Sequence, residues 1–464
     1  MIINDVEIDP GSFRDPSGFV FKRNGILFRQ INNFYKENYD FLIASNLYSS
    51  LVDKELLVPH EEVDAIAAIE SLAYKIIKPK NIPFISYPYE WCFNQLKQSA
   101  LTTLKIQEIA LQHGMILKDS SAYNIQFYNG KPVFIDTLSF EIYEEGKPWK
   151  GYRQFCQHFL SPLALMSFKD AQLNQLLKIF LDGIPLNLTS KLLPWRTYFR
   201  PSMFAHIHLH ARSQKHFADN SMSYKHLKIS KHSLLAINDS LQSSISKLNF
   251  KIAKSTWSLY YMDNNYTSEA FADKKEIFSN YLEIINPKSL FDFGSNTGVF
   301  SRIASGKGIN TVSFDYDQTC VEINYLETKS NHDTNNLPLI VDVSNPSPGI
   351  GWSNTERMSL LDRGPADVVA ALALLHHLHI SNNIPMAKVA QYFSKLCTYL
   401  IIEFIPLSDS QTKRLLSCRD SNFQNHSESA FETESSAYFS ILKKQKIKDS
   451  ERTMYLMQKN QKTK

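Results

Sequence analysis

FDFGSNTGVFS, residues 291–301, indicates the fold of the second half of the chain. An apolar run ends beside Asp292 and Gly294, and a helical pattern begins at Val299. Glycine allows a sharp turn and lets a ligand approach the main chain, and the start of a helix offers free amides. The spacing is Gly-x-x-x-Gly, whereas dinucleotide pyrophosphates are bound by Gly-x-Gly-x-x-Gly. The stretch therefore predicts a ligand-binding loop at the carboxyl end of a strand.

An alternating series of strands and helices surrounds this loop. Apolar runs such as SLFDFG, TVSFDYD, LPLIVDV, ADVVAALALL and YLIIEFIP alternate with the helical patterns GVFSRIASGKG, QTCVEINYLETK and PMAKVAQYFSKLC. Continuously apolar strands that alternate with helices are typical of a parallel sheet covered on both faces. We therefore expect an α/β domain over about residues 250–460, with its ligands beyond the carboxyl ends of the strands.

Acidic side chains follow the next two predicted strands. Asp315 lies 21 residues beyond Gly294, the usual offset for a carboxylate that accepts hydrogen bonds from ribose hydroxyls. Asp342 follows the third strand, where it could contact an adenine amino group. The alternative is that these are unrelated turn residues, but the register of loop and two acids over three strands favours a nucleotide-cofactor site.

On these residues, the segment from about 255 to 460 resembles a class I S-adenosylmethionine-dependent methyltransferase. The resemblance implies a Rossmann-like, seven-stranded, mostly parallel sheet that is closed by an antiparallel hairpin. It also implies a lid helix before the core. The implied cofactor-binding residues are Asp292, Gly294, Asn296, Gly298, Asp315, Asp342, Tyr266 and Lys274.

Two histidines follow the fourth predicted strand of this half. His376 and His377, in LALLHHLHI, are candidate catalytic bases because imidazole titrates near neutral pH. A packed or capping histidine is the equally weighted alternative. No Asn-Pro-Pro-Tyr or Asp-Pro-Pro-Tyr follows this strand, so methylation of the amino groups of DNA bases or of glutamine is disfavoured. The sequence there is more similar to small-molecule or glycan O-methyltransferases.

The first half carries the outline of a phosphotransferase. Asp119, Asn124 and Asp136 match the acceptor-orienting acid and the two metal ligands of γ-phosphoryl transfer, in that order. This half resembles the kinase-like fold, more its sugar and aminoglycoside branch than the protein kinases. Arg29 stands at the expected lysine position, however, and no glycine-rich phosphate loop is visible. An active phosphotransferase site, a degenerate or acceptor-binding site, and simple turn caps all remain open.

Local patterns predict several elements of the first half. Asn24-Gly25 joins two extended runs, which indicates a hairpin because both turn residues need positive φ. FNQLKQSALTTLKIQEIALQHG has helical spacing and ends at a glycine suited to a C-cap. We expect an α+β domain over residues 1–240 that is mainly helical from about 150. The polar residues 236–250 are the expected boundary between the two domains.

Composition narrows the class of protein. The chain has 464 residues, 43% hydrophobic content and a formal charge of only +4, so we expect a folded protein of two or three domains with no nucleic-acid partner. No signal peptide is visible and no apolar run reaches the ~20 residues of a membrane span. Five scattered cysteines indicate reduced thiols and a cytoplasmic location. The histidines His206, His208, His210 and His216 cluster, and alternate spacing would put the first three on one face of a strand. A metal site there is disfavoured because no carboxylate accompanies them.

The chain as a whole resembles the two-part bacterial methyltransferases related to the nodulation protein NoeA. The motifs that carry this resemblance include DPSGFVFKRNGILFRQI, PFISYPYEW, KDSSAYNIQF, FIDTLSFE and HLHARSQ. It implies a tie to surface glycans or signalling oligosaccharides. From the register of the cofactor residues over three strands, we expect an enzyme that uses S-adenosyl-L-methionine to methylate a small molecule or saccharide, at oxygen, with the first domain recognising the acceptor. The alternatives are a phosphotransferase in the first domain, or a binding module without catalysis.

Overall fold

The computed structural model describes residues 6–212, 228–251, 266–416 and 425–461, and the chain divides into two compact units. Unit 1 comprises Met1–Lys251 together with Ile350–Arg357, and unit 2 comprises Ile252–Gly349 and Met358–Lys464. Unit 1 ends next to the predicted boundary at residues 236–250, and α10 (Lys231–Ser246) occupies much of that stretch and buries Leu241 and Ile245. Segment Ile350–Arg357, which we expected to belong wholly to the second domain, is part of unit 1.

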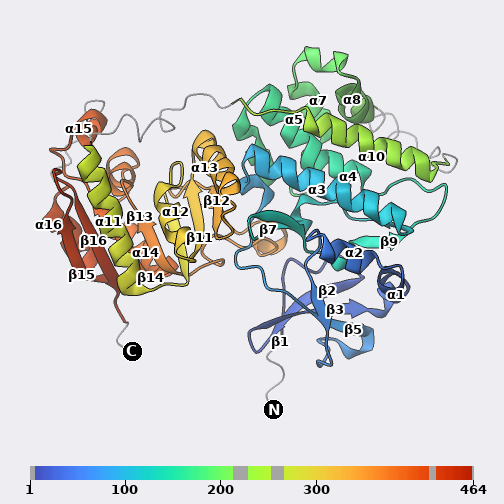
Figure 1. Ribbon diagram of the computed structural model, residues 1–464, viewed down its shortest axis with the longest axis horizontal. Helices are drawn as coiled ribbons and strands as arrows, with labels where there is room; N and C mark the ends of the chain where they lie inside the picture. Colours follow the sequence, from blue (N-terminus) through green and yellow to red (C-terminus); the bar gives the residue numbers. More distant parts are fainter. Residues whose placement is uncertain (1–5, 213–227, 252–265, 417–424, 462–464) are drawn as a thin grey trace. The chain divides into compact units, whose positions relative to one another are not determined.

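Unit 1 has an antiparallel sheet and a group of helices. The sheet order is β1 (Val6–Ile8), β2 (Gly18–Arg23), β3 (Ile26–Asn32), β5 (Ala73–Pro79) and β4 (His60–Glu62). The small pairs are β6 (Met115–Leu117) with β9 (Phe140–Ile142), and β7 (Ile125–Tyr128) with β8 (Lys131–Phe134). The helices are α1 (Lys36–Ala44), α2 (Leu47–Asp53), α3 (Phe93–Gln112), α4 (Tyr152–Phe155), α5 (Ser161–Phe168), α6 (Leu176–Ile179), α7 (Leu186–Leu192), α8 (Pro201–Met203) and α10 (Figure 1).

Two local predictions for unit 1 are confirmed. Asn24 and Gly25 have φ of 50° and 75°, and Arg23 pairs with Ile26 across the β2–β3 turn. Helix α3 ends at Gln112, and Gly114 follows with φ of 77°. Both turns place left-handed backbone where glycine or asparagine tolerates it best.

The histidine cluster lies on a helix and not on the expected strand. Helix α8 continues into the π-helical turn η9 (Phe204–Leu209), which holds His206 and His208. His206 bonds Tyr152 and Ser240, whereas His208 bonds Ser190 and Thr197. The two rings therefore have separate structural partners. His216 lies outside the described residues.

Unit 2 has a seven-stranded sheet. Its order is β12 (Asn336–Ile340), β11 (Asn310–Asp315), β10 (Ser289–Phe293), β13 (Ala366–Ala371), β14 (Cys397–Phe404), β16 (Thr453–Lys459) and β15 (Phe439–Lys446). The first five strands are parallel, and β16 and β15 pair antiparallel. The helices are α11 (Ser268–Ile285), α12 (Val299–Gly306), α13 (Gln318–Ser330), α14 (Met386–Leu396), α15 (Ser410–Leu416) and α16 (Glu428–Ser436). The α/β fold expected for this half is confirmed.

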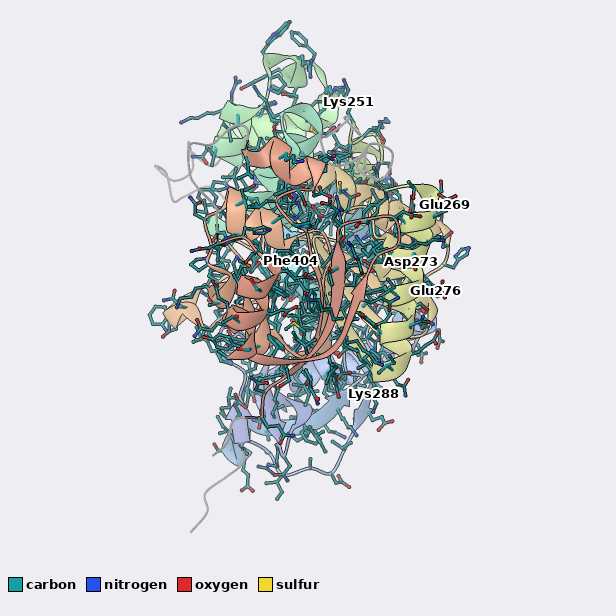
Figure 2. All side chains as sticks on the ribbon, turned by 90° about the vertical axis from the view of Figure 1, so that its left-hand side faces the viewer. Lys251, Glu269, Asp273, Glu276, Lys288 and Phe404 are labelled. Carbon is teal, nitrogen blue, oxygen red and sulfur yellow. The ribbon has the colours of Figure 1, made fainter. Side chains whose placement is uncertain are left out.

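Helix α11 covers one face of this sheet. It buries Ile277, Phe278 and Tyr281 in a core shared with β10, β13, β14 and β16, while Glu269 and Glu276 lie on its outer face (Figure 2). This packing holds α11 against the sheet, and it places the buried side chain of Lys274 near the carboxyl ends of the strands. Among the helices of the described residues, none is both long and apolar enough to cross a membrane.

Candidate functional site

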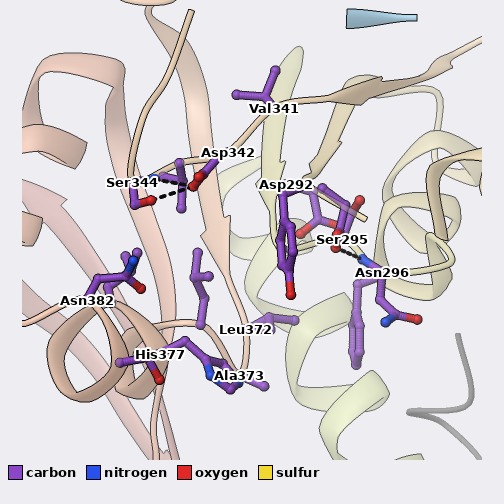
Figure 3. Close-up of a pocket in the computed structure, with 18 of the residues that line it drawn as sticks. Asp292, Ser295, Asn296, Val341, Asp342, Ser344, Leu372, Ala373, His377 and Asn382 are labelled. Atoms are coloured by element: carbon purple, nitrogen blue, oxygen red, sulfur yellow. Dashed lines mark hydrogen bonds between the residues drawn. The ribbon is translucent and has the colours of Figure 1, made fainter. Parts of the chain in front are cut away.

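A pocket opens at the carboxyl ends of the parallel strands of unit 2 (Figure 3). Its walls come from the loops after β10, β11, β12 and β13 and from the start of α11. The lining residues are Tyr266, Phe271, Lys274, Asp292, Gly294, Ser295, Asn296, Phe300, Asp315, Tyr316, Val341, Asp342, Val343, Ser344, Leu372, Ala373, Leu374, His377, Leu378, Ser381 and Asn382. Seven of the eight residues expected to bind the cofactor are among them; Gly298 is the exception.

The glycine loop after β10 turns through left-handed backbone. Gly294, Asn296 and Gly298 have φ of 72°, 51° and 80°. A Cβ on Gly298 would lie 2.1 Å from the Asn324 side-chain oxygen, so glycine is required there for packing under the loop. Asn296 occupies a strained position at the pocket, which is where such strain concentrates in functional sites.

Two buried carboxylates form the floor of the pocket. Asp292 accepts a hydrogen bond from the Ser301 hydroxyl at 2.6 Å, and Asp315 accepts one from the main-chain N–H of Asn296 at 2.8 Å and one from that of Asp317 at 2.9 Å. Burial is the main cause that raises the pKa of Asp292 to about 6 and that of Asp315 to about 6. Burial disfavours the charged form of an acid, so both carboxylates are poised to gain from a cationic or hydrogen-bond-donating ligand.

The third acid, Asp342, lies at the exposed rim. Its Oδ1 accepts hydrogen bonds from the Ser344 amide at 2.8 Å and the Ser344 hydroxyl at 2.6 Å, as Figure 3 shows. These bonds fix the turn after β12 and hold the carboxylate beside Val341 and Val343. The three acids that the sequence predicted at the ends of successive strands, Asp292, Asp315 and Asp342, therefore line one pocket.

A buried ion network supports the opposite wall, and sequence reasoning missed its centre, Glu403. Its carboxylate binds Lys274 Nζ at 2.7 Å, accepts the Ala373 N–H at 2.7 Å and accepts the Tyr266 hydroxyl. The Arg452 guanidinium lies 3.7 Å away. Ala373 has φ of 51°, a conformation unusual for alanine that the Glu403 bond helps to hold. An acid inside the apolar run YLIIEFIP was the available signal.

The Lys274–Glu403 pair is almost fully removed from water. Its side chains are 3% and 0% exposed. Lys274 therefore lines the pocket as the cation of an internal pair, and burial lowers its pKa while Glu403 opposes that effect. Lys274 and the attraction of Arg452 keep the pKa of Glu403 below its usual value although burial raises it.

The two candidate bases occupy different environments. His377 lines the pocket, whereas His376 is 3% exposed and does not line it. Burial lowers the pKa of His377 to about 4 and places that of His376 well below the ordinary value. Both rings are thus neutral at pH 7, and of the two only His377 faces the site.

The three phosphotransfer candidates come together in unit 1. Ser139 Oγ donates to Asp136 at 2.7 Å and receives a hydrogen bond from Asn124 at 3.1 Å. Burial and the neighbouring Asp136 charge raise the pKa of Asp119. Arg29 pairs with Asp136 at 2.6 Å, with side chains 11% and 13% exposed. Asp136 is therefore the acidic partner of Arg29.

Segment Ile350–Arg357 packs into unit 1 through charged side chains. Arg14 donates two hydrogen bonds to Glu356, at 2.7 and 2.9 Å. The Arg357 guanidinium lies 4.3 Å from the centre of the Tyr123 ring, and Tyr123 directly precedes Asn124. Within the loop between β12 and β13, the segment Ile350–Arg357 is therefore a structural part of unit 1.

Comparison with known proteins gives one relative over almost the whole chain. The nodulation protein NoeA of Rhizobium meliloti (strain 1021) is 33% identical over 462 residues, which cover 97% of this chain and 96% of the relative. No family model matches the chain.

Solved structures resemble parts of it. The bifunctional kinase-methyltransferase WbdD is 16% identical, with 43% of this chain and 41% of that chain covered and a TM-score of 0.30. The magnesium protoporphyrin IX methyltransferase of Synechocystis PCC 6803 with bound SAH is 15% identical, with 44% and 93% covered and a TM-score of 0.31. The chain spans less than half the length of the WbdD structures.

The NoeA protein is 33% identical to this chain, and the match covers nearly the full length of both proteins. The chain therefore belongs to the family of the nodulation protein NoeA.

Proposed function

We propose that the protein is an S-adenosylmethionine-dependent methyltransferase that acts on oxygen of a small-molecule or saccharide acceptor. The observation that carries this proposal is the convergence of Asp292, Asp315 and Asp342, from three successive parallel strands, on one pocket. The family assignment is consistent with it, and the parallel sheet closed by an antiparallel hairpin is the topology that the methyltransferase resemblance implies.

The pocket residues fit this cofactor chemically. The bound cofactor would supply an activated methyl group on a positively charged sulfur. Asp315 retains lone pairs for two ribose hydroxyls although both its oxygens accept main-chain amides, since each carboxylate oxygen can accept more than one bond. Asp342 stands where an adenine amino group could donate to it. Asp292 provides buried negative charge near the cationic end.

Methyl transfer needs alignment above all, and a base where the acceptor is a hydroxyl. His377 is the candidate for that base because it faces the pocket and is neutral at pH 7. The acceptor hydroxyl would give its proton to the neutral His377 ring as its oxygen bonds the methyl carbon and the bond from that carbon to the cofactor sulfur breaks. His376 is assigned to packing beside it.

Unit 1 is proposed to recognise the acceptor and to have a kinase-like ancestry. Asp119, Asn124 and Asp136 keep the order of a phosphotransfer site, but Arg29 already neutralises Asp136 at 2.6 Å. A Mg²⁺ ion bound to this carboxylate would have to displace the arginine. An acceptor with hydroxyl groups could instead bond Asp119 and Asn124 without breaking the pair.

The cofactor assignment is tested by calorimetric titration of the full chain with S-adenosylhomocysteine. We expect saturable binding that is weakened at least tenfold in Asp315→Ala, because one ionic hydrogen-bond partner of the ribose is lost. Glu276→Ala, on the exposed face of α11, is the matched control and should bind as the wild type does. Absence of binding to the wild type, or equal affinity in Asp315→Ala, would refute the assignment.

The acceptor is tested separately. Incubation with cofactor labelled in its methyl group and with fractionated bacterial extract should transfer label to a saccharide or small molecule, and His377→Ala should reduce that transfer. The phosphotransferase alternative predicts Mg-ATP binding that is lost in Asp136→Ala. If Mg-ATP binds and sugars are phosphorylated, acceptor recognition alone is the wrong role for unit 1.

A further inference from the structure

A short turn of unit 1 presents two large aromatic side chains to solvent. The 3-10 turn η8 (Trp195–Phe199) joins α7 to α8, which lie at the end of the helical part of unit 1 in Figure 1. Trp195 and Phe199 are each 75% exposed, and their rings meet edge to face with centroids 5.5 Å apart. Burial of such rings is strongly favourable, so two exposed rings in contact indicate a surface that binds a partner.

The turn is held rigidly in this exposed form. Thr197 donates its hydroxyl to the Pro194 carbonyl at 2.7 Å and lies 2.8 Å from His208 Nε2. His208 Nδ1 lies 2.8 Å from the Ser190 hydroxyl, and the Tyr198 ring stacks on the imidazole with centroids 3.7 Å apart. The histidine thus ties the turn to α7 and η9, which explains its burial without any metal.

The charged residues in the sequence on either side of the two rings are all basic. Residues 183–212 contain Lys191, Arg196, Arg200 and Arg212 but no aspartate or glutamate. Lys191, Arg196 and Arg200 are exposed, and the Arg200 guanidinium also lies 4.8 Å from the centre of the Phe168 ring. Thirty residues without an aspartate or glutamate, in a chain whose overall charge is only +4, give this segment a net positive charge.

We propose that this aromatic–basic turn, Lys191–Arg200, binds the surface of a membrane that contains anionic lipids. Tryptophan and phenylalanine insert favourably at the level of the headgroups, and arginines beside them are attracted to lipid phosphates. A stacking platform for a neutral saccharide is the competing use of exposed aromatic rings. It normally needs carboxylates or amides to bind the sugar hydroxyls, and between Gly183 and Arg212 the chain offers one asparagine, Asn187, and no acid.

The inference is independent of the proposed methyltransferase activity and is tested by sedimentation of the full chain with vesicles. Wild type should bind vesicles of 40% phosphatidylglycerol in phosphatidylcholine at least about thirtyfold more tightly than pure phosphatidylcholine, on the scale expected for two or three basic side chains in the field of an anionic surface. The double variant Trp195→Ser, Phe199→Ser should lose about tenfold or more of this binding. Arg196→Gln with Arg200→Gln should lose the preference for phosphatidylglycerol.

The matched control is Trp352→Ser, which removes a tryptophan that is 72% exposed on segment Ile350–Arg357. It should bind vesicles as wild type does, and thermal unfolding of every variant checks that the fold is kept. Wild type that fails to sediment, or a Trp195→Ser, Phe199→Ser variant that sediments equally, overturns the proposal. So does a dimer in solution that this double variant converts to monomer, because a second copy would then cover the turn.

Discussion

Replacing Asp292 by asparagine should make the ligand-free protein more stable while removing cofactor binding. The carboxyl group is 2% exposed, and burial raises its pKa from 3.8 to about 6. A group whose pKa is raised by folding binds its proton more tightly in the native state. Its contribution to the free energy of unfolding therefore falls as pH rises from about 4 and levels off above about 6.

The size of the effect follows from this shift. About two pKa units correspond to about 3 kcal/mol of native-state destabilisation above pH 7. Asparagine removes this cost of burying a charged carboxylate. It also weakens the hydrogen bond from the Ser301 hydroxyl and the attraction to Lys274, and these two losses reduce the gain in stability by about 1 kcal/mol or more. We expect Asp292→Asn to gain about 1–2 kcal/mol at pH 8, and the gain to shrink by about 1 kcal/mol at pH 5.

Urea unfolding of wild type and Asp292→Asn at pH 5, 6, 7 and 8 measures both quantities, with Glu276→Gln on the outer face of α11 as control. Titration with S-adenosylhomocysteine at pH 8 gives the loss of binding in parallel. An Asp292→Asn protein that is less stable than wild type at pH 8 would refute the reasoning. A stability difference that does not change with pH would refute it equally.

Three further substitutions test other parts of the structure by urea unfolding. Glu403→Gln should lower the free energy of unfolding by about 3–5 kcal/mol because Lys274 is left buried without its counter-charge. Adding Lys274→Met should recover part of this loss. A loss below about 1 kcal/mol in Glu403→Gln would contradict the buried ion network. Arg29→Gln should cost about 1–3 kcal/mol by leaving Asp136 without its cation, and an unchanged midpoint would mean that the pair does not form. Gly298→Ala should cost at least about 1 kcal/mol because φ is 80° and the Cβ has no space, whereas a neutral result would show that the loop relaxes.

Features with a local physical cause were predictable from sequence. The Asn24-Gly25 turn is specified by two adjacent positive φ values, and the end of α3 by Gly114. In unit 2, continuously apolar strands alternate with helices, which is typical of a parallel sheet. The carboxyl ends of parallel strands meet at one edge of the sheet, so the acids near the ends of β10, β11 and β12 were predicted to lie together. That rule also explains why all three acids were expected at one site before any contact was known.

Features that depend on distant partners were not predictable. Glu403 has its role only because α11 brings Lys274 to it and the loop after β13 brings Ala373. The histidines at 206, 208 and 210 have a spacing that fits one face of a strand, but α8 propagates into them and only tertiary bonds decide between the two forms. The inclusion of Ile350–Arg357 in unit 1 rests on Arg14, which is more than 300 residues away in sequence.

Asp136 of unit 1 and the buried acids Asp292 and Asp315 of unit 2 differ in how their negative charge is balanced. In unit 1, Asp136 meets the Arg29 guanidinium at 2.6 Å, so its charge is balanced without a ligand. In unit 2, the donors to Asp315 are main-chain amides, and that to Asp292 is a hydroxyl. Burial keeps both of these acids reluctant to ionise. A positively charged ligand would relieve that penalty in the unit 2 pocket, whereas a metal ion in unit 1 would have to break an existing ion pair before it gained anything.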